Sequence, residues 1–305
     1  MSHAGTIAVP VTGGKMVLAM TGGSISGGAG RDQLYLYVCN SDTDALSGRG
    51  QLYVFRVDPA VIMEDPRSAS SIRKGPPVNG RFVPVDAPTA AAPGALGSRV
   101  QSLGCLNFVK LEDLAVDHER LDAFYFTDAL GYGSGNDALL SSGGGRLYHV
   151  ALDPFDPTRA AEVEVLLDQT AGDDIFHPSS IDTDERCVMI QENPGTRGLH
   201  PARILRYDTR ARRVEAVAEC AERDRRGRLL AQGVGGEWES SGIQNVGEIM
   251  GVDTWLFTVQ AHTLRVRGNS GRSSEAGQLL LMRGSRNPGM DPSTREKSNP
   301  DAGAH

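Results

Sequence analysis

The sequence has no C-x-x-C pair. Its four cysteines, Cys39, Cys105, Cys187 and Cys220, are widely separated. A cysteine-based zinc site or a dithiol redox motif needs close spacing, so neither is expected. Cys39, Cys105 and Cys187 stand beside apolar residues and are predicted to be buried thiols. The even count leaves disulfides open, and the cysteines do not decide the cellular compartment.

Long apolar runs and a surplus of basic residues are also missing. No run approaches the roughly 20 residues that a membrane-spanning helix requires, and the first twenty residues do not read as a signal peptide. Acidic residues outnumber basic ones by 38 to 31, for a net charge of −7. We therefore expect no membrane span and no nucleic-acid partner. Ser241-Gly242 lacks the preceding glycine of G-x-S-x-G, which argues against a serine hydrolase.

Glycine, in contrast, is abundant. The 305 residues include 37 glycines, and the chain is 39% hydrophobic and 23% charged. The balance of apolar and charged residues is typical of a globular protein. Many glycines suit short strands joined by tight turns better than long helices. The length allows one large β domain or two ordinary ones.

A multi-strand pattern recurs along the chain. The near-continuous apolar segments, typical of strands buried on both faces, are Leu34–Asp42, Ala123–Asp128, Cys187–Asn193 and Trp255–His262. The alternating segments that follow them, typical of half-buried strands, are Gly50–Pro59, Gly145–Pro154, Ala202–Thr209 and Gly277–Gly284. Polar leading segments precede three of the pairs, at Leu111–Asp117, His177–Asp184 and Trp238–Asn245.

This repeat predicts an all-β fold, a β-propeller with four recognisable blade-like units that is small or part of a larger one. The alternative is an all-β sandwich whose strands are similar by coincidence. The propeller is expected over residues 1–283, with residues 67–98 as a Pro-, Ala- and Gly-rich excursion outside the sheet. Residues 284–305 are polar and are expected to be a disordered tail.

The stretch from Gly236 to Arg267 combines two carboxylates, Glu237 and Glu239, with a Ser-Ser-Gly turn and an apolar strand. Carboxylate oxygens held on a rigid edge suit calcium. The alternative is a solvated acidic turn that precedes a core strand.

Several motifs resemble the PhoX-type alkaline phosphatases and the secreted bacterial β-propeller family around them. They cover roughly residues 108–283 and include F-V-K-L-E-D-L-A-V-D (Phe108–Asp117), H-P-S-S-I-D (His177–Asp182), V-M-I-Q-E-N-P (Val188–Pro194), A-R-I-L-R-Y-D (Ala202–Asp208), E-W-E-S-S-G-I (Glu237–Ile243), T-W-L-F-T-V-Q-A-H-T-L (Thr254–Leu264) and G-Q-L-L-L-M-R (Gly277–Arg283).

The resemblance implies a propeller that binds calcium beside an iron pair and hydrolyses phosphate monoesters, in a periplasmic or extracellular protein. It makes Glu112, Asp113, Glu192 and Glu239 the expected metal ligands, with Glu239 also catalytic. For Glu112 and Asp113, the alternative is that they only cap a strand turn. Arg203 or Arg197 is expected to clamp phosphate oxygens, as a bidentate guanidinium can. The chain is expected to act on a small phosphate ester as a monomer.

Two departures from the family keep other functions open. Pro178-Ser179-Ser180 stands where family members carry Pro-Asp-Asn or Pro-Asp-Ser, and an upstream T-P-W-G-T-W-x-x-x-E-E segment is missing, which puts the iron in doubt. One alternative is a non-catalytic, calcium-stabilised propeller that binds a ligand or partner. Another is a lactonase-like calcium hydrolase. His262 could be a metal ligand or an acid-base group, but a hydrogen-bonded structural role is favoured, and His177 is expected in a turn.

Overall fold

The structure is a computed structural model. It describes residues 5–284 apart from 23–31, 62, 66, 87–88, 91–92, 130–143, 194–199, 224–225, 229, 231–237 and 268–272. Among the described residues, no helix is long and apolar enough to cross a membrane. The predicted tail, residues 284–305, lies outside the described residues apart from Gly284.

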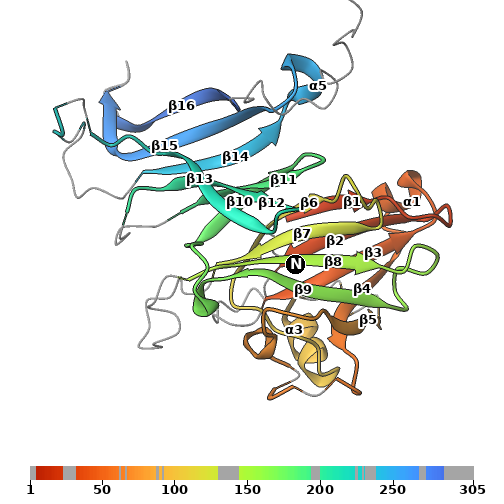
Figure 1. Cartoon of the computed structure of the whole chain (residues 1–305). Coiled ribbons are helices and arrows are strands. Elements are labelled where there is room, and N and C mark those ends of the chain that lie inside the picture. Colours follow the sequence, from red (N-terminus) through yellow and green to blue (C-terminus); the bar gives the residue numbers. More distant parts are fainter. Residues whose placement is uncertain are drawn as a thin grey trace, which may run out of the picture.

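The chain is mostly β-structure, which confirms the all-β prediction (Figure 1). The strands are β1 (Gly5–Val9), β2 (Met16–Gly22), β3 (Gln33–Cys39), β4 (Gln51–Val57), β5 (Val78–Val85), β6 (Leu111–Val116), β7 (Ala123–Asp128), β8 (Arg146–Leu152), β9 (Ala161–Asp168), β10 (Pro178–Thr183), β11 (Cys187–Glu192), β12 (Arg203–Asp208), β13 (Arg213–Glu219), β14 (Glu239–Asn245), β15 (Thr254–Arg267) and β16 (Ser273–Arg283). The helices are short: α1 (Asp42–Leu46), α3 (Pro93–Ser102), α5 (Gly247–Met250) and the 3-10 turns η1 (Ala69–Ser71) and η2 (Gln169–Ala171).

The strands form successive antiparallel meanders. Strands β10–β13 make a four-stranded sheet and β14–β16 a three-stranded one. The first nine strands form one sheet in the order β1-β2-β3-β4-β5-β9-β8-β7-β6, because β5 and β9 pair over a short stretch. The buried strands expected from the sequence correspond to β3, the third strand of the first meander, and to β7, β11 and β15, the second strands of the later ones.

Apolar side chains fill the spaces between neighbouring meanders. One core lies between β1–β5 and β6–β9, a second between β6–β9 and β10–β13, and a third between β10–β13 and β14–β16. Strands β3, β7 and β11 are buried on both faces, as their continuous apolar sequence predicts. In β15 the buried residues alternate with more exposed ones, so this strand is buried on one face only. Helix α3 covers a further apolar face of the first meander, where Leu96 and Val100 pack with Tyr35 and Val54.

The segment 67–98 was predicted to leave the sheet, and this prediction is wrong. It contains η1, most of α3 and strand β5, which pairs with both β4 and β9. Prolines and glycines usually indicate a loop, but here two of them lie within a paired strand. Pro84 is nevertheless accommodated in β5, and Gly80 lies where an added Cβ would come within 2.6 Å of the Arg56 carbonyl oxygen.

The cysteine prediction is confirmed. Cys39, Cys105, Cys187 and Cys220 are all buried free thiols. Burial raises the pKa of Cys105 and of Cys220 to about 12, so these side chains remain neutral and pack as small apolar groups.

The first strands of successive meanders lie side by side, with β6 against β10 and β10 against β14. Each carries a β-bulge at an equivalent place in its pairing with the second strand: between Leu111 and Leu114, between Pro178 and Ile181, and between Ser241 and Gln244. A bulge inserts an extra residue and turns side chains out of the regular alternation. The repeat of this irregularity brings polar side chains from three strands to one place.

Candidate functional site

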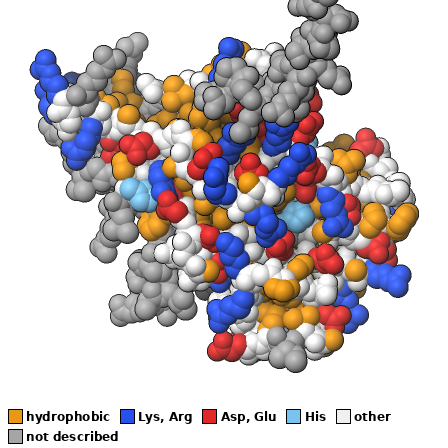
Figure 2. Space-filling view, viewed as in Figure 1, with side chains coloured by type: hydrophobic (Ala, Val, Ile, Leu, Met, Phe, Trp, Pro, Cys, Tyr) orange, Lys and Arg blue, Asp and Glu red, His pale blue; other side chains and the backbone are white. Residues whose placement is uncertain are grey.

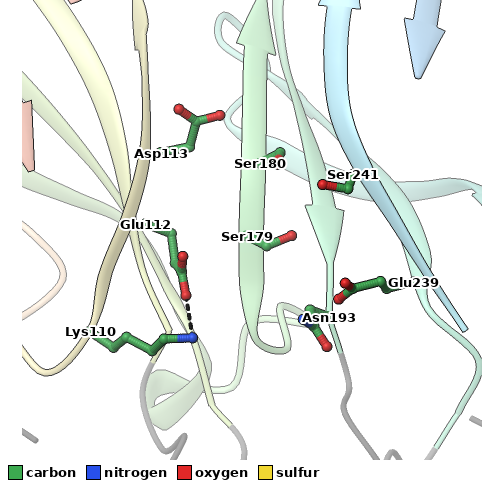
Figure 3. A pocket seen from close by; sticks show the side chains of 8 residues that line it. All are labelled: Lys110, Glu112, Asp113, Ser179, Ser180, Asn193, Glu239 and Ser241. Carbon is green, nitrogen blue, oxygen red and sulfur yellow. Dashed lines mark ion pairs between the residues drawn. The ribbon is translucent and has the colours of Figure 1, made fainter. Parts of the chain in front are cut away.

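A polar pocket lies where the bulged strands β6, β10 and β14 converge (Figure 3). Its volume is about 310 Å³. It is lined by Lys110, Glu112, Asp113, Ser179, Ser180, Asn193, Glu239 and Ser241. Figure 3 shows the β6 residues on one side, the two serines of β10 in the middle, and Glu239 and Ser241 of β14 on the other. The pocket therefore joins residues that are more than 100 positions apart in the sequence.

Asp113 connects two meanders at the edge of this pocket. Its carboxylate accepts a hydrogen bond from the Leu114 N–H (2.9 Å) and another from the Ile181 N–H of β10 (3.2 Å). Burial raises the pKa of Asp113 above the ordinary value, although the two backbone N–H groups act in the opposite direction. The side chain is therefore held firmly, with part of its accepting capacity already used.

Glu112 forms an ion pair with Lys110 at 2.5 Å on the same side of the pocket. Burial, followed by the positive charge of Lys110, lowers the pKa of His177 to about 4, so this histidine is neutral near pH 7. His177 lies just before β10 with a φ of 42°, in agreement with the predicted turn. Among the described lining residues, the pocket thus has one basic side chain, Lys110, beside the carboxylates.

Glu239 is tied to His262. The Nε2 atom of His262 lies 3.3 Å from Glu239 Oε1, and Nδ1 lies 2.9 Å from Glu275 Oε2. Burial disfavours the charged imidazole, but the hydrogen bonds to the two glutamates more than offset it and raise the pKa of His262. Both ring nitrogens are engaged, which supports the structural role that we predicted for His262.

Glu192 and Arg203 were predicted to belong to the metal site and the phosphate clamp, but the structure pairs them with each other. Arg203 Nε and Nη2 donate to the two carboxylate oxygens of Glu192, each at 2.8 Å. Arg203 also makes a bidentate contact with Asp174, at 2.7 and 2.9 Å. Glu192 accepts a further hydrogen bond from the Phe176 N–H, and its side chain is 0% exposed.

The Glu192–Arg203 pair is therefore an internal ion pair rather than part of the pocket, whose lining includes neither residue. The hydrogen bonds that Arg203 donates to Glu192 are the largest influence that raises the pKa of Arg203, so the guanidinium stays charged. The other residue considered for the clamp, Arg197, and the second carboxylate of the acidic turn, Glu237, lie outside the described residues.

The donors of the pocket are carboxylate, hydroxyl and amide oxygens, which are the ligands that calcium prefers. Among the described lining residues there is no imidazole or thiolate, so this set fits calcium better than iron, which imidazole also suits. No group of three or more His, Cys, Asp or Glu side chains in the described part of the chain is close enough to hold a metal ion. A cation would therefore need the serine and asparagine oxygens, water or a movement of the carboxylates.

Sequence reasoning identified Glu112, Asp113 and Glu239 but missed Lys110, Ser179, Ser180, Asn193 and Ser241 as lining residues. A signal for the two serines was present. Ser179-Ser180 stands opposite Gln191 of the second strand just as Glu112-Asp113 stands opposite Thr127, so the two pairs occupy equivalent bulges. Where the resembling family has a carboxylate after the proline, this chain contributes hydroxyl groups to the pocket.

No protein-family model matches the sequence. A search of curated proteins likewise finds no match.

Proposed function

We propose that the successive meanders are blades arranged around a common axis, as in a β-propeller that is incomplete or part of a larger one. Adjacent first strands and apolar cores between neighbouring sheets support this arrangement. In such an arrangement the first strands line the axis. The pocket on β6, β10 and β14 then lies at one end of a channel.

We further propose that this pocket binds a divalent cation, calcium in the first instance. The single observation that carries the proposal is the convergence of Glu112, Asp113 and Glu239 on one oxygen-lined pocket. Partial burial keeps water from fully screening these carboxylates, so a bound cation would offset unfavourable local charge. Of the four expected metal ligands, Glu192 is left out of this proposal because it does not line the pocket.

The activity that fits this site best is hydrolysis of phosphate monoesters, in line with the PhoX-like motifs. A bound cation would supply charge neutralisation for the phosphate and a more acidic water molecule. Lys110, held by its ion pair with Glu112, places an ammonium group at the pocket wall that would donate to an oxygen of a bound phosphate. Glu239, fixed by His262, is the carboxylate placed to accept a proton from an attacking water. Arg203 has no role in this scheme.

Calcium binding is tested by isothermal titration calorimetry on the wild type, Glu239→Gln and Asp182→Asn. Asp182 is a matched control, since it lies on β10 but does not line the pocket. We expect binding to the wild type and to Asp182→Asn, and at least tenfold weaker binding to Glu239→Gln. Equal calcium binding by all three proteins would mean that the cation binds outside this pocket.

Catalysis is tested separately with p-nitrophenyl phosphate, in calcium and in chelator. Hydrolysis that needs calcium and is lost in Glu239→Gln would support the phosphatase. Calcium binding without hydrolysis would support a non-catalytic propeller. Hydrolysis of a lactone instead of the phosphate ester would indicate the lactonase-like alternative.

A further inference from the structure

The outer strand of the last meander, β16, has an open edge. The sheets β6–β9 and β10–β13 each end in a fourth strand, whereas the sheet order β14-β15-β16 ends at the third. Among the described strands, none pairs with the outer edge of β16. A long edge strand exposes a row of backbone N–H and C=O groups that favours pairing with another strand.

Three consecutive leucines lie on this strand and reach the solvent. Leu279 is 67% exposed, Leu280 37% and Leu281 41%. Leu279 and Leu281 pair with Thr258 and Leu256 of β15 on the outward face, whereas Leu280 pairs with buried Phe257 on the core side. Figure 2 shows hydrophobic side chains at the surface in the upper part of the view, where β14–β16 lie. Such exposure of adjacent leucines marks a contact surface.

The charges on β16 fit a second copy of the same strand. In an antiparallel pair with a twofold axis at Leu279, residue 275 stands opposite residue 283 of the other copy, because both lie four positions from the centre. Glu275 would then face Arg283, twice in the pair. The Glu275 carboxylate also contacts His262 and Arg265 of its own chain, but it is 43% exposed and can accept from a further cation. Opposite charges directly across a ladder are stabilising. Both side chains lie on the same face as Leu279, since alternate residues of a strand share a face.

We propose that two copies of this chain associate through their β16 strands, in antiparallel register about Leu279, to form one continuous six-stranded sheet. Each β16 supplies the fourth strand that the other copy's last sheet needs. Leu279 packs against its own counterpart at the axis, and Leu281 lies opposite Gly277. A contact of this kind is isologous and closes as a dimer instead of growing into a fibre. The proposal does not require the pocket to bind a cation, although Glu275 also contacts His262, which holds Glu239. It replaces the expectation of a monomer.

The register is tested by cysteine cross-linking of the full chain. Directly opposite residues of an antiparallel pair have Cα atoms about 4.5–5.5 Å apart, within the reach of a disulfide. Leu279→Cys is expected to form a disulfide-linked dimer under mild oxidation. Leu281→Cys is the matched control, because its two copies would lie about 13 Å apart along the ladder. The native cysteines are buried and do not compete. Equal cross-linking of both variants, or of neither, would overturn the register.

The charge pairs are tested by sedimentation and native mass spectrometry. The single reversals Arg283→Glu and Glu275→Arg each place two like-charge pairs across the axis, so we expect self-association about tenfold weaker than in the wild type. An equal mixture of the two variants restores both opposite-charge pairs and should form the heterodimer. Leu279→Lys should be monomeric, whereas Leu121→Lys, which alters an exposed leucine in the turn before β7, should dimerise normally.

Three results would overturn the proposal. The first is a wild-type monomer at all accessible concentrations. The second is a dimer that is insensitive to Leu279→Lys and to both reversals, because another surface would then mediate it. The third is a monomer whose β16 amides are nevertheless protected from hydrogen exchange. That result would mean that a segment of the same chain occupies the edge.

Discussion

The carboxylate of Asp113 on β6 accepts a hydrogen bond from the backbone N–H of Ile181 on β10, at 3.2 Å. The next interface has a related contact, in which Asp182 of β10 accepts from the Asn245 N–H of β14 at 2.6 Å. An aspartate at the bulge, or just after it, thus ties each first strand to the following one. Burial raises the pKa of both carboxyl groups, so both are desolvated by the packing between meanders.

Variants of these two aspartates should distinguish an effect on stability from an effect on calcium binding. Asp113→Asn and Asp182→Asn should each lower the free energy of unfolding by about 1–3 kcal/mol. Each substitution weakens the hydrogen bond in which the aspartate carboxylate accepts from a backbone N–H of the neighbouring strand. Urea denaturation measures this loss. Only Asp113 lines the pocket, so only Asp113→Asn should also weaken calcium binding. Loss of calcium binding in both variants would indicate that it depends on the packing of the meanders and not on the pocket carboxylate.

The Glu192–Arg203 pair should contribute to stability. Arg203→Met leaves the Glu192 carboxylate buried without its cation, and we expect a loss of about 3–5 kcal/mol in urea denaturation. The double variant Arg203→Met/Glu192→Gln removes the stranded charge and keeps an acceptor for the Phe176 N–H, so it should recover most of that loss. A loss below about 1 kcal/mol in the single variant would mean that Glu192 is hydrated and available to a ligand after all.

Asp128 should make stability depend on pH. Burial raises its pKa to about 6, against the opposing effect of hydrogen bonds from the Lys110 and Val109 N–H groups and of the Arg146 charge. Between about pH 4 and pH 6 the folded state holds a proton that the unfolded state has released. The contribution of Asp128 is therefore fully present below about pH 4 and falls as pH rises through 6.

The measurement is the free energy of unfolding of wild type and Asp128→Asn from pH 4 to pH 8. Relative to the variant, the wild type should lose about 3 kcal/mol across this range and change little above pH 7. The variant lacks only the Asp128 carboxyl group. The difference between the two proteins at each pH therefore cancels the contributions of the other titrating residues. Parallel curves for the two proteins would mean that Asp128 ionises in the folded state as it does in the unfolded chain.

We expect that Gly242 is required because of its left-handed backbone conformation and not because a side chain would lack space. It lies in the bulge of β14 with a φ of 64°, and an added Cβ would meet nothing within 4 Å. Gly242→Ala should therefore cost about 1–2 kcal/mol, because side-chain-bearing residues disfavour the left-handed region. Gly242→Asn should cost less and Gly242→Val more, since asparagine tolerates that region and a β-branched residue does not. Thermal denaturation orders the three variants, and equal costs would point to a steric cause.

Much of the fold could be predicted from local pattern. The apolar strands and the alternating strands that follow them correspond to observed elements, because burial on one or two faces imposes its period directly on the sequence. The fourth strands β9 and β13 were not recognised. β13 shows why, since all its residues are exposed or partly exposed and no apolar pattern distinguishes it from a loop.

The sequence by itself determined where most strands run, that Cys39, Cys105 and Cys187 are buried, and that Glu112, Asp113 and Glu239 belong to polar segments that precede buried strands. Only the tertiary structure decided which carboxylates meet. Glu192 is predicted beside them. In the register of β11 and β12, however, Gln191 pairs with Ile204, so Glu192 lies opposite Arg203. That arginine neutralises Glu192. Strand register and bulges set side-chain direction, and they depend on contacts between residues far apart in sequence, which local periodicity does not encode.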